Sequence, residues 1–353
     1  MNINDMVKKT GEWLKGTGPA HDIVLSSRIR LARNLAPYPF PEYMTDDVAE
    51  TVITQTHQAI DGSNYLKKHL FFPYTEISAL DRELLLERHL ISRDLAGSER
   101  PCGVCFTEDE IVSIMINEED HLRIQVLQSG FNLLEALRII DIIDTELERE
   151  LPYAFNNQLG YLTACPTNVG TGLRASCMLH LPALVMTKQI NKVLQALARL
   201  NIAVRGLYGE GTQAVGNLFQ FSNQVTLGKN EETIATELEK IVKQVIDHER
   251  EARESLLKKR SDRLIDQIWR SVGVLKSARI VSSEEASSLL SLVRLGSDLG
   301  IAKNSDIHQM NELFMVIQPA HLQKIFKKEL PVNERDIKRA ALIREKLQVV
   351  PLE

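Results

Sequence analysis

Hydrophobic and polar residues follow both helical and strand patterns in the first two-thirds of the chain. In the segments TDDVAETVITQTHQAI (45–60) and ALDRELLLERHLISRDLAG (79–97), apolar residues recur every three or four positions. This spacing predicts two helices, the second ending at Gly97, because glycine is common just past a helix end.

Short apolar runs in the same part of the chain predict strands. EIVSIMIN (110–117) and LRIQVLQ (122–128) flank the residues EEDH and predict a hairpin whose turn carries carboxylates. IAVRGLYGEG (202–211) and LFQFSNQVTLG (218–228) form a second apolar pair around a glycine-rich link. Because strands joined by short links pair antiparallel, we expect an α+β fold, an antiparallel sheet flanked by helices.

Long helical patterns replace these runs from Glu231 onward, where no convincing strand is found. The segments 271–300 and 333–348 fit short helices of a bundle. Ser282 or Ser283 and Asn333 are the expected N-cap residues of these helices, since their side chains can accept a backbone N–H.

Length and charge narrow the class of protein. A chain of 353 residues, 44% hydrophobic and 25% charged, can bury a sizeable core. Together with the change of pattern, this length predicts two domains, residues 1–247 with core motifs at 22–228, and an all-helical domain at 248–353.

The net charge of −5 argues against direct nucleic-acid or lipid binding. No apolar run approaches the roughly 20 residues of a membrane span and no secretion signal is evident, so a cytoplasmic location without membrane contact is expected.

The four cysteines are expected to be reduced in that compartment. Cys102 and Cys105 form a C-x-x-C pair, but a structural zinc site needs a second ligand pair, and none has suitable spacing. The pair therefore indicates apolar packing, and no metal ligand is predicted among the protein side chains.

Arginines recur beside predicted turns and strand ends. They are Arg28, Arg30 and Arg33 in SSRIRLAR, Arg123 in NEEDHLR, Arg174 in GTGLRAS and Arg205 in VRGLYGEG. Several guanidinium groups that converge from separate segments can hold a polyphosphate, since each forks onto phosphate oxygens. At the strand period of two, Arg28 and Arg30 share one face while Ile29 and Leu31 face the core. Any one arginine alone is more often a surface residue, but Arg174 and Arg205 lie in glycine-rich turns without an evident packing role.

Carboxylates lie in two places near these arginines. The first is NEED at 117–120, where Glu118 and Asp120, taken singly, are expected to be solvated turn residues. The second is Glu210, which lies between Gly209 and Gly211, and the glycines would let it approach a ligand. Carboxylates beside phosphate-binding arginines indicate phosphoryl transfer to a cationic or hydrogen-bonding acceptor.

Four segments resemble the signature segments of the phosphagen kinases, the creatine and arginine kinase family. They are SSRIRLAR, NEEDHLR, CPTNVGTGLRAS and RGLYGEG followed by GNLFQFSNQVTLG, in the same order and at similar separations. The resemblance covers Asp22 to Asp247. It implies an antiparallel sheet flanked by helices, and magnesium-dependent transfer of the ATP γ-phosphoryl group to a guanidinium nitrogen.

The resemblance also implies individual roles. Glu119 and Glu210 match the family's paired carboxylates, which orient the acceptor guanidinium and draw away its proton. Cys165 matches the reactive cysteine near the acceptor, although a small buried thiol is the plainer interpretation. His89 would lie by the nucleotide, whereas alone it would be read as a helix-surface residue. The expected ATP-binding set is Ser26, Ser27, Arg28, Ile29, Arg30, His89, Arg123, Arg174, Ala175, Ser176, Cys177, Met178, Arg205, Gly206, Leu207, Tyr208, Gly209 and Glu210.

Two departures from creatine and arginine kinases concern the ends of the chain. Those enzymes resemble each other in having a helical domain before the SSRIR segment, whereas here that segment begins at Ser26 and a helical tail follows the catalytic motifs. A site without that lid would be open to an arginine on a protein surface. The combination resembles the bacterial protein arginine kinases.

The match to that family extends to the run RDIKRA in the tail. There the family has a phosphoarginine pocket that feeds back on activity, which implies an allosteric role for Arg335, Asp336, Ile337, Lys338, Arg339 and Ala340. On a helix, Arg335 and Arg339 lie one turn apart and could grip a phosphate, while Asp336 could pair with the guanidinium. An ordinary charged helix surface is the alternative.

The function expected from the resemblance is therefore protein arginine phosphorylation that marks proteins for regulation or Clp-dependent degradation, with ATP and Mg²⁺. The implied partners are protein substrates that include a heat-shock repressor, a cysteine-rich activator protein, a Clp unfoldase-protease and further copies of the chain. A kinase of free arginine or another small guanidine, and a silent adaptor that binds phosphoarginine, remain alternatives.

Overall fold

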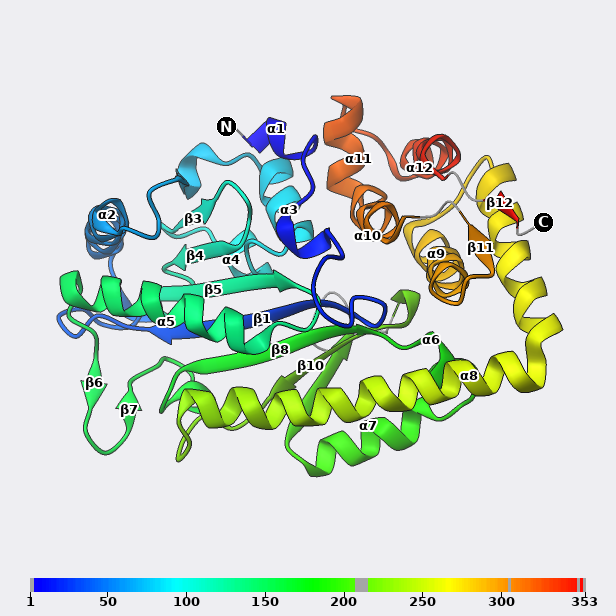
Figure 1. Ribbon diagram of the computed structural model, residues 1–353. Coiled ribbons are helices and arrows are strands. Elements are labelled where there is room, and N and C mark those ends of the chain that lie inside the picture. The colour runs from blue at the N-terminus through cyan, green and yellow to red at the C-terminus, as the bar shows by residue number, and fades with distance from the viewer. Residues whose placement is uncertain (1–2, 207–214, 304–305, 348–349, 352–353) are drawn as a thin grey trace.

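A single antiparallel sheet forms the centre of the molecule (Figure 1). The computed structural model describes residues 3–206, 215–303, 306–347 and 350–351. The sheet has eight strands in the order β2-β3-β4-β5-β1-β8-β10-β9, and neighbouring strands run antiparallel, so the expected fold class is confirmed. The strands are β1 (Val24–Arg33), β2 (His69–Pro73), β3 (Gly103–Thr107), β4 (Val112–Ile116), β5 (Leu122–Ser129), β8 (Leu173–His180), β9 (Ile202–Gly206) and β10 (Leu218–Asn223).

Long helices cover one face of this sheet. Figure 1 shows α5 (Leu133–Glu150) and α8 (Glu231–Ser277) running along the strands, and α6 (Pro182–Met186) packs against α8 while α7 (Ile190–Arg199) packs against β9. The residues between sheet and helices form the largest hydrophobic cluster, which includes fully buried Ile29 of β1 and Ile140 of α5. Burial of this apolar area is the main stabilising contribution, at about 25 cal/mol per Å².

Both predicted hairpins are present. β4 and β5 pair antiparallel around the turn that carries the carboxylates, and β9 pairs with β10. The link between β9 and β10 spans residues 207–214, so Leu207, Tyr208, Gly209 and Glu210 lie outside the described residues.

The first predicted helix is confirmed as α2 (Asp46–Gly62), but the second is wrong as a single helix. It forms α3 (Ala79–Glu87) and α4 (Arg93–Ala96), with Gly97 at the end of α4 as expected. The break arises because the Ser92 side chain accepts the N–H of Leu95 and so begins a new helix, a cap that competes with the apolar periodicity. His89 lies in this break with a left-handed φ of 60° and is not on a helix surface.

The C-terminal helices pack around a second hydrophobic cluster, to the right in Figure 1. Ser282 caps α9 by accepting the N–H of Glu285, as predicted. Asn333 is wrong as a cap, because α12 begins at Val332 and Pro331, which fixes its own φ, occupies the N-cap position. The helices are α9 (Ser283–Asp298), α10 (Ile307–Val316), α11 (Pro319–Phe326) and α12 (Val332–Lys346).

A two-stranded sheet, β11 (Ala302–Lys303) with β12 (Val350–Pro351), occurs in the tail where no strand was predicted. α8 contributes Leu238 to the first cluster and Leu275 to the second, so the expected boundary at residue 247 falls inside a continuous helix. The two-domain division stays a prediction.

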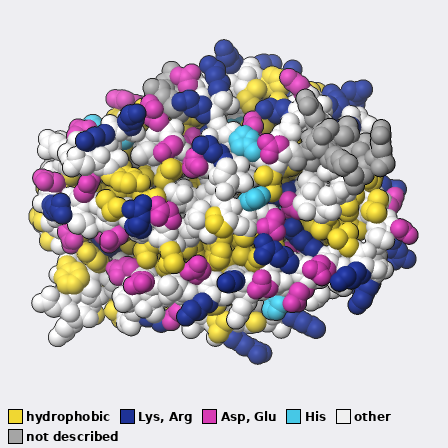
Figure 2. All heavy atoms as spheres, in the orientation of Figure 1, with side chains coloured by type: hydrophobic (Ala, Val, Ile, Leu, Met, Phe, Trp, Pro, Cys, Tyr) yellow, Lys and Arg dark blue, Asp and Glu magenta, His cyan; other side chains and the backbone are white. Residues whose placement is uncertain are grey.

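Short elements complete the described chain. They are α1 (Ile3–Met6), η1 (Glu12–Leu14), η2 (Pro41–Tyr43), η3 (Tyr74–Glu76), β6 (Phe155–Asn156), β7 (Gly160–Tyr161), η4 (Pro166–Asn168) and η5 (Val215–Asn217). Basic and acidic side chains intermingle over the face seen in Figure 2. Within the described ranges, no helix has the length and apolarity needed to cross a membrane.

Candidate active site

Five predicted phosphate-binding arginines lie on the face of the sheet opposite α5 and α8. Residues paired directly across antiparallel strands point to the same face. Arg30 pairs with Arg174, and Arg123 pairs with Ala32, two positions along β1 from Arg30. Arg205 pairs with Gln220, which in turn pairs with Met178, four positions along β8 from Arg174. The shared face therefore carries Arg28, Arg30, Arg123, Arg174 and Arg205.

The alternation predicted for β1 is confirmed, since Arg28 and Arg30 are half-buried while Ile29 and Leu31 are fully buried in the core. The same alternation divides the side chains of the expected ATP-binding set between the two faces of the sheet. The side chains of Ser27, Ile29, Ala175 and Cys177 occupy the opposite face and cannot contact a ligand at the arginines. Ser27 donates to the carbonyl oxygen of Gly130, and burial raises the pKa of Cys177 to about 12.

A glycine allows β8 to approach β1 closely before Arg174. Gly172 has a left-handed φ of 63°, and a Cβ added there would lie 2.6 Å from the carbonyl oxygen of Ala32. The N–H of Ala32 donates to the carbonyl oxygen of Gly172 at 2.9 Å. The GTGLRAS segment is therefore a tight entry into a strand, which places Arg174 opposite Arg30.

The arginine face concentrates positive charge. Burial, together with Arg123, Arg174 and Arg205, lowers the pKa of Arg28 to about 9. Burial and the nearby Arg28 lower the pKa of Arg30 as well. The Nε atom of Arg30 is buried and has no hydrogen-bond partner among the described residues. A bound polyphosphate fits this observation, because it would supply both the missing acceptor and the missing negative charge.

The turn carboxylates Glu118 and Asp120 were expected to be solvated, and this prediction is wrong. Both accept hydrogen bonds from other groups of the protein. Glu118 accepts two hydrogen bonds from Arg123 Nη1 at 2.6 and 2.5 Å. Asp120 accepts from Asn34 Nδ2 at 2.6 Å and from the N–H of Ala164 at 2.7 Å. Side chains alternate between the two faces of a sheet only within a strand and not in a turn. The sequence therefore did not indicate that these two side chains point inward.

Glu119, between them, is exposed and lines a cavity of about 300 Å³ together with Cys165. Partial burial, and the neighbouring carboxylates Asp120 and Glu118, raise its pKa above that of an ordinary glutamate. Cys165 is half-buried, and its Sγ lies 3.0 Å from Thr167 Oγ1. Four of the five arginines line the same cavity, namely Arg30, Arg123, Arg174 and Arg205. The structure thus brings a carboxylate of raised pKa and a thiol to the edge of a cationic surface.

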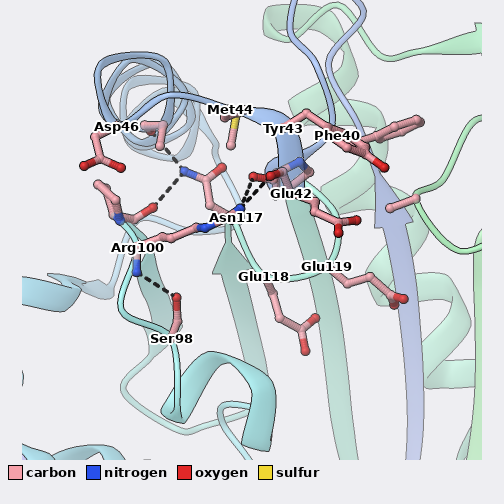
Figure 3. A pocket seen from close by; sticks show the side chains of 14 residues that line it. Phe40, Glu42, Tyr43, Met44, Asp46, Ser98, Arg100, Asn117, Glu118 and Glu119 are labelled. Atoms are coloured by element: carbon pink, nitrogen blue, oxygen red, sulfur yellow. Dashed lines mark hydrogen bonds between the residues drawn. The ribbon is translucent and has the colours of Figure 1, made fainter.

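A second cavity of about 380 Å³ shares Glu119 with the first (Figure 3). Its rim is η2, with the exposed ring of Tyr43 and the carboxylate of Glu42, and Asp46 of α2 lies beside it. Arg100 Nη1 holds this rim in place by donating to the carbonyl oxygens of Pro41 and Glu42 at 3.0 and 2.8 Å. Nothing in the sequence indicated this cavity, because its walls come from segments with no shared pattern.

The predicted nucleotide-side histidine lies next to Arg28 in a small recess. The ring of His89 packs edge-on against Trp13 at 5.1 Å, and Gln125 Nε2 donates to its carbonyl oxygen at 2.6 Å. Burial and Arg28 lower the pKa of His89 to about 3, so the ring is neutral at physiological pH. Ser26, Ser176 and Met178 line the same recess, and sequence reasoning missed Trp13 and Gln125.

The RDIKRA run lies on α12. Arg339 is buried, and it donates to the carbonyl oxygens of Ile317 and Val281 at 2.7 and 2.9 Å and to Asp336. In the structure Arg339 and Asp336 therefore bond to each other and not to a ligand. Arg335 is half-buried, Ile337 and Lys338 are exposed and Ala340 is buried. The assignment of the run to phosphoarginine binding stays a prediction.

Comparison with known proteins agrees with a phosphoryl-transfer site. The sequence profile of the ATP:guanido phosphotransferase C-terminal catalytic domain matches residues 47–252, and that of the protein-arginine kinase McsB C-terminal domain matches residues 261–353. The protein-arginine kinase of Moorella thermoacetica is 49% identical over 350 residues, 98% of this chain and 99% of that protein. That of Bacillus subtilis is 48% identical over 343 residues, covering 96% and 93%. A crystal structure of lombricine kinase has 27% identity and a TM-score of 0.58, over 70% of this chain and 75% of the other.

The chain therefore belongs to the ATP:guanido phosphotransferase family. Its activity is that of the protein-arginine kinases within this family, the ATP-dependent phosphorylation of arginine side chains in proteins.

Proposed function

We propose that the arginine face binds the phosphates of ATP and that Glu119 prepares the acceptor arginine. The observation that carries this proposal is the position of Glu119 between the two cavities, one cationic and one acidic. Arg30, with its unpartnered Nε, and Arg174 opposite it would bind phosphate oxygens. Mg²⁺ would neutralise part of the phosphate charge and would be held by nucleotide oxygens and water, because the cationic lining does not favour a free cation.

The acceptor guanidinium must lose a proton before its nitrogen can attack phosphorus. Glu119 is suited to take this proton, because its raised pKa makes it a better base than an ordinary glutamate. Glu210, outside the described residues, is proposed as the second carboxylate, and Cys165 as a group that lies near the acceptor. The transferred phosphoryl group then bonds to the guanidinium nitrogen as its bond to the ADP oxygen breaks.

An arginine on a protein surface would enter through the second cavity. The rim presents the aromatic ring of Tyr43, 73% exposed, and the carboxylates Glu42 and Asp46. A cationic arginine and its flanking chain match such a surface by charge and by apolar contact. These features favour protein arginine over free arginine as the acceptor.

The resemblance to bacterial protein arginine kinases extends the proposal to regulation and partners. We propose that the RDIKRA run of α12 binds phosphoarginine and that the chain acts in the cytoplasm as a homo-oligomer. A heat-shock repressor as substrate, a cysteine-rich activator and a Clp unfoldase-protease that takes marked proteins complete this proposal. Its support is the resemblance and the match of the tail.

The test incubates the protein and MgATP with either a folded arginine-bearing protein or free arginine, and detects phosphoarginine by mass spectrometry under non-acidic conditions. We expect label on protein arginines, and a loss of about 10²- to 10⁴-fold in rate for Glu119→Gln. Glu254→Gln, an exposed glutamate on α8, is the matched control and should retain the wild-type rate. An undiminished rate for Glu119→Gln would overturn the role of Glu119. Label on free arginine alone would overturn entry through the second cavity.

A further inference from the structure

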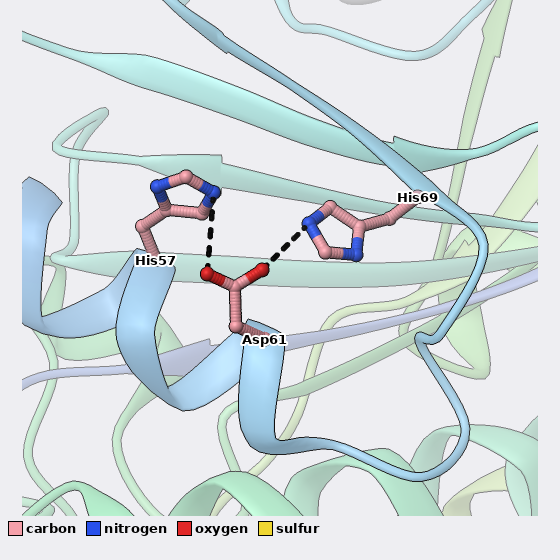
Figure 4. A group of neighbouring side chains, drawn as sticks. All are labelled: His57, Asp61 and His69. Carbon is pink, nitrogen blue, oxygen red and sulfur yellow. Dashed lines mark ion pairs between the residues drawn. The ribbon is translucent and has the colours of Figure 1, made fainter.

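Two histidines and an aspartate converge away from the active site, where α2 ends near the edge strand β2 (Figure 4). His57 and Asp61 lie one turn apart on α2, and His69 is the first residue of β2. The Asp61 carboxylate lies 3.8 Å from His57 Nε2 and 3.4 Å from His69 Nε2. One donor atom from each residue lies within 4.8 Å of the other two. Figure 4 shows the two rings approaching the carboxylate from different sides.

Contacts within the protein fix the orientation of both rings. His69 Nδ1 lies 2.7 Å from the carbonyl oxygen of Leu66 and can donate to it, which leaves Nε2, facing Asp61, as the nitrogen that would bind a metal. Histidines that bind metals commonly donate their other ring N–H to a backbone carbonyl in this way. The ring of His57 stacks on Phe71 at 3.7 Å with an interplanar angle of 8°. The donors are therefore held together by contacts that need no metal.

We propose that His57, Asp61 and His69 bind a divalent transition-metal ion of the Zn²⁺ class. Two imidazole nitrogens and one carboxylate oxygen suit Zn²⁺, Co²⁺, Ni²⁺ or Cu²⁺, whereas Mg²⁺ and Ca²⁺ prefer oxygen ligands alone. Tetrahedral coordination at roughly 2.0–2.1 Å places ligand atoms about 3.3 Å apart, so the donors need to close by about 1.5 Å at most. Because Asp61 is exposed, water can supply the fourth ligand. This site departs from the expectation that no side chain ligates a metal.

The consequence of such an ion is a cross-link between helix and sheet. It would join α2 to β2 across the intervening segment 63–68, and β2 is an edge strand that pairs on one side only, with β3. None of the three residues lines the two cavities that share Glu119. The ion would therefore stabilise the fold without entering the reaction, by binding the folded chain more tightly than the unfolded one.

The experiment titrates the full-length, metal-free protein with Co²⁺ and Zn²⁺ in the absence of nucleotide. We expect one Co²⁺ per chain, with the visible absorption of tetrahedral cobalt, and its displacement by Zn²⁺. His57→Gln and His69→Gln should each weaken binding at least about tenfold, the scale of losing one ligand. His248→Gln, at an exposed position on α8, is the matched control and should bind as the wild type does.

Thermal unfolding supplies a measurement that does not depend on spectroscopy. Zn²⁺ should raise the Tm of the wild type and of His248→Gln, and leave that of the double variant His57→Gln/His69→Gln unchanged. The melting of the metal-free variants shows whether they fold. Equal Co²⁺ binding by the double variant, or no binding by the wild type at micromolar metal, would overturn the proposal.

Discussion

One buried histidine connects the catalytic sheet to the helical tail. His180 ends β8, and its Nε2 lies 2.8 Å from the hydroxyl of Ser291 on α9. Burial, and the nearby Arg294 and Arg253, lower the pKa of His180 well below its ordinary value. As the pH falls, His180 is protonated in the unfolded chain at a higher pH than in the folded protein, where its pKa is lowered. Stability from this residue is therefore complete above about pH 6.5 and declines below it.

We predict that the free energy of unfolding decreases below that pH by about 1.4 kcal/mol per pH unit for each histidine of this kind. His180→Gln retains a side chain that can bond to Ser291 but cannot titrate. Urea unfolding followed at a series of pH values should give a slope shallower by about one proton for this variant. An unchanged slope would show that His180 does not titrate as its surroundings indicate.

The raised pKa of Glu119 predicts the pH dependence of catalysis. Its carboxylate must be ionised to accept a proton, so activity is lost as the pH falls through this raised value. We expect the acidic limb of the kcat/KM profile to lie above the ordinary glutamate pKa. Its neighbour Glu118 contributes to the raised pKa. A substitution of Glu118 is unsuitable for this test, because it would also break the ion pair with Arg123. A limb at or below the ordinary value would assign the limiting proton to another group.

Among the short elements, η2 forms the rim through which the acceptor protein is proposed to enter. Tyr43→Ala removes the exposed ring and should raise KM for a folded protein substrate several-fold, the cost of losing one aromatic contact of about 1 kcal/mol. The KM for ATP should not change, because Tyr43 does not line the arginine cavity. Tyr65→Ala, another exposed tyrosine that lines neither Glu119 cavity, is the control. Equal effects of the two substitutions on KM would contradict docking at η2.

Strands were the elements best predicted from the sequence, because a period of two identifies both a strand and the face of each residue. Short apolar runs around turn residues gave the two hairpins, and the rule gave the shared face of Arg28 and Arg30. It could not give β11 and β12, since two-residue strands pair through contacts distant in the chain. The helix over 79–97 failed for a local reason, the cap formed by Ser92.

The candidate site was predictable to the extent that its residues lie in regular strands. Asp120 is buried against Asn34 from a distant segment, whereas Glu118 pairs with Arg123 of its own hairpin, and the pattern of residues in the turn indicates neither partner. The second cavity escaped prediction for the same reason. The resemblance to a family gave the expected ATP-binding residues as contiguous runs. Within each strand, alternate side chains of such a run lie on opposite faces of the sheet, so only part of each run points toward the arginines.

At the scale of the whole molecule, Glu87 joins the tail to the catalytic part. Its carboxylate accepts the N–H groups of Ala320 and His321 at 2.7 and 2.9 Å, at the start of α11, and also contacts His321 Nδ1 at 2.7 Å. The adjoining Arg88 forms a buried ion pair with Glu110 and lies 3.3 Å from His321 Nε2. Glu87 and Arg88 directly precede His89 in the chain, the residue predicted to lie by the nucleotide.

We predict that Glu87→Ala lowers the free energy of unfolding by about 1–3 kcal/mol, because it leaves buried donors of α11 without an acceptor. Calorimetry should also show a broader transition, as the tail loses an anchor to α3. Glu83→Ala, an exposed position one turn earlier on α3, is the matched control and should change stability by less than about 0.5 kcal/mol. Identical unfolding of the two variants would show that Glu87 does not hold α11 to α3.

The pairing of β1 with β5 and β8 also constrains how this gene can change in length. Deleting one residue within β1 would turn Ile29 and Leu31 toward the arginine face and drive two guanidinium groups into the apolar core. Burying an unpaired charge costs several kcal/mol, comparable with the whole stability of a domain. A library of single-codon deletions across this strand should therefore yield misfolded protein, whereas substitutions of Arg28 or Arg30 should yield folded protein without activity.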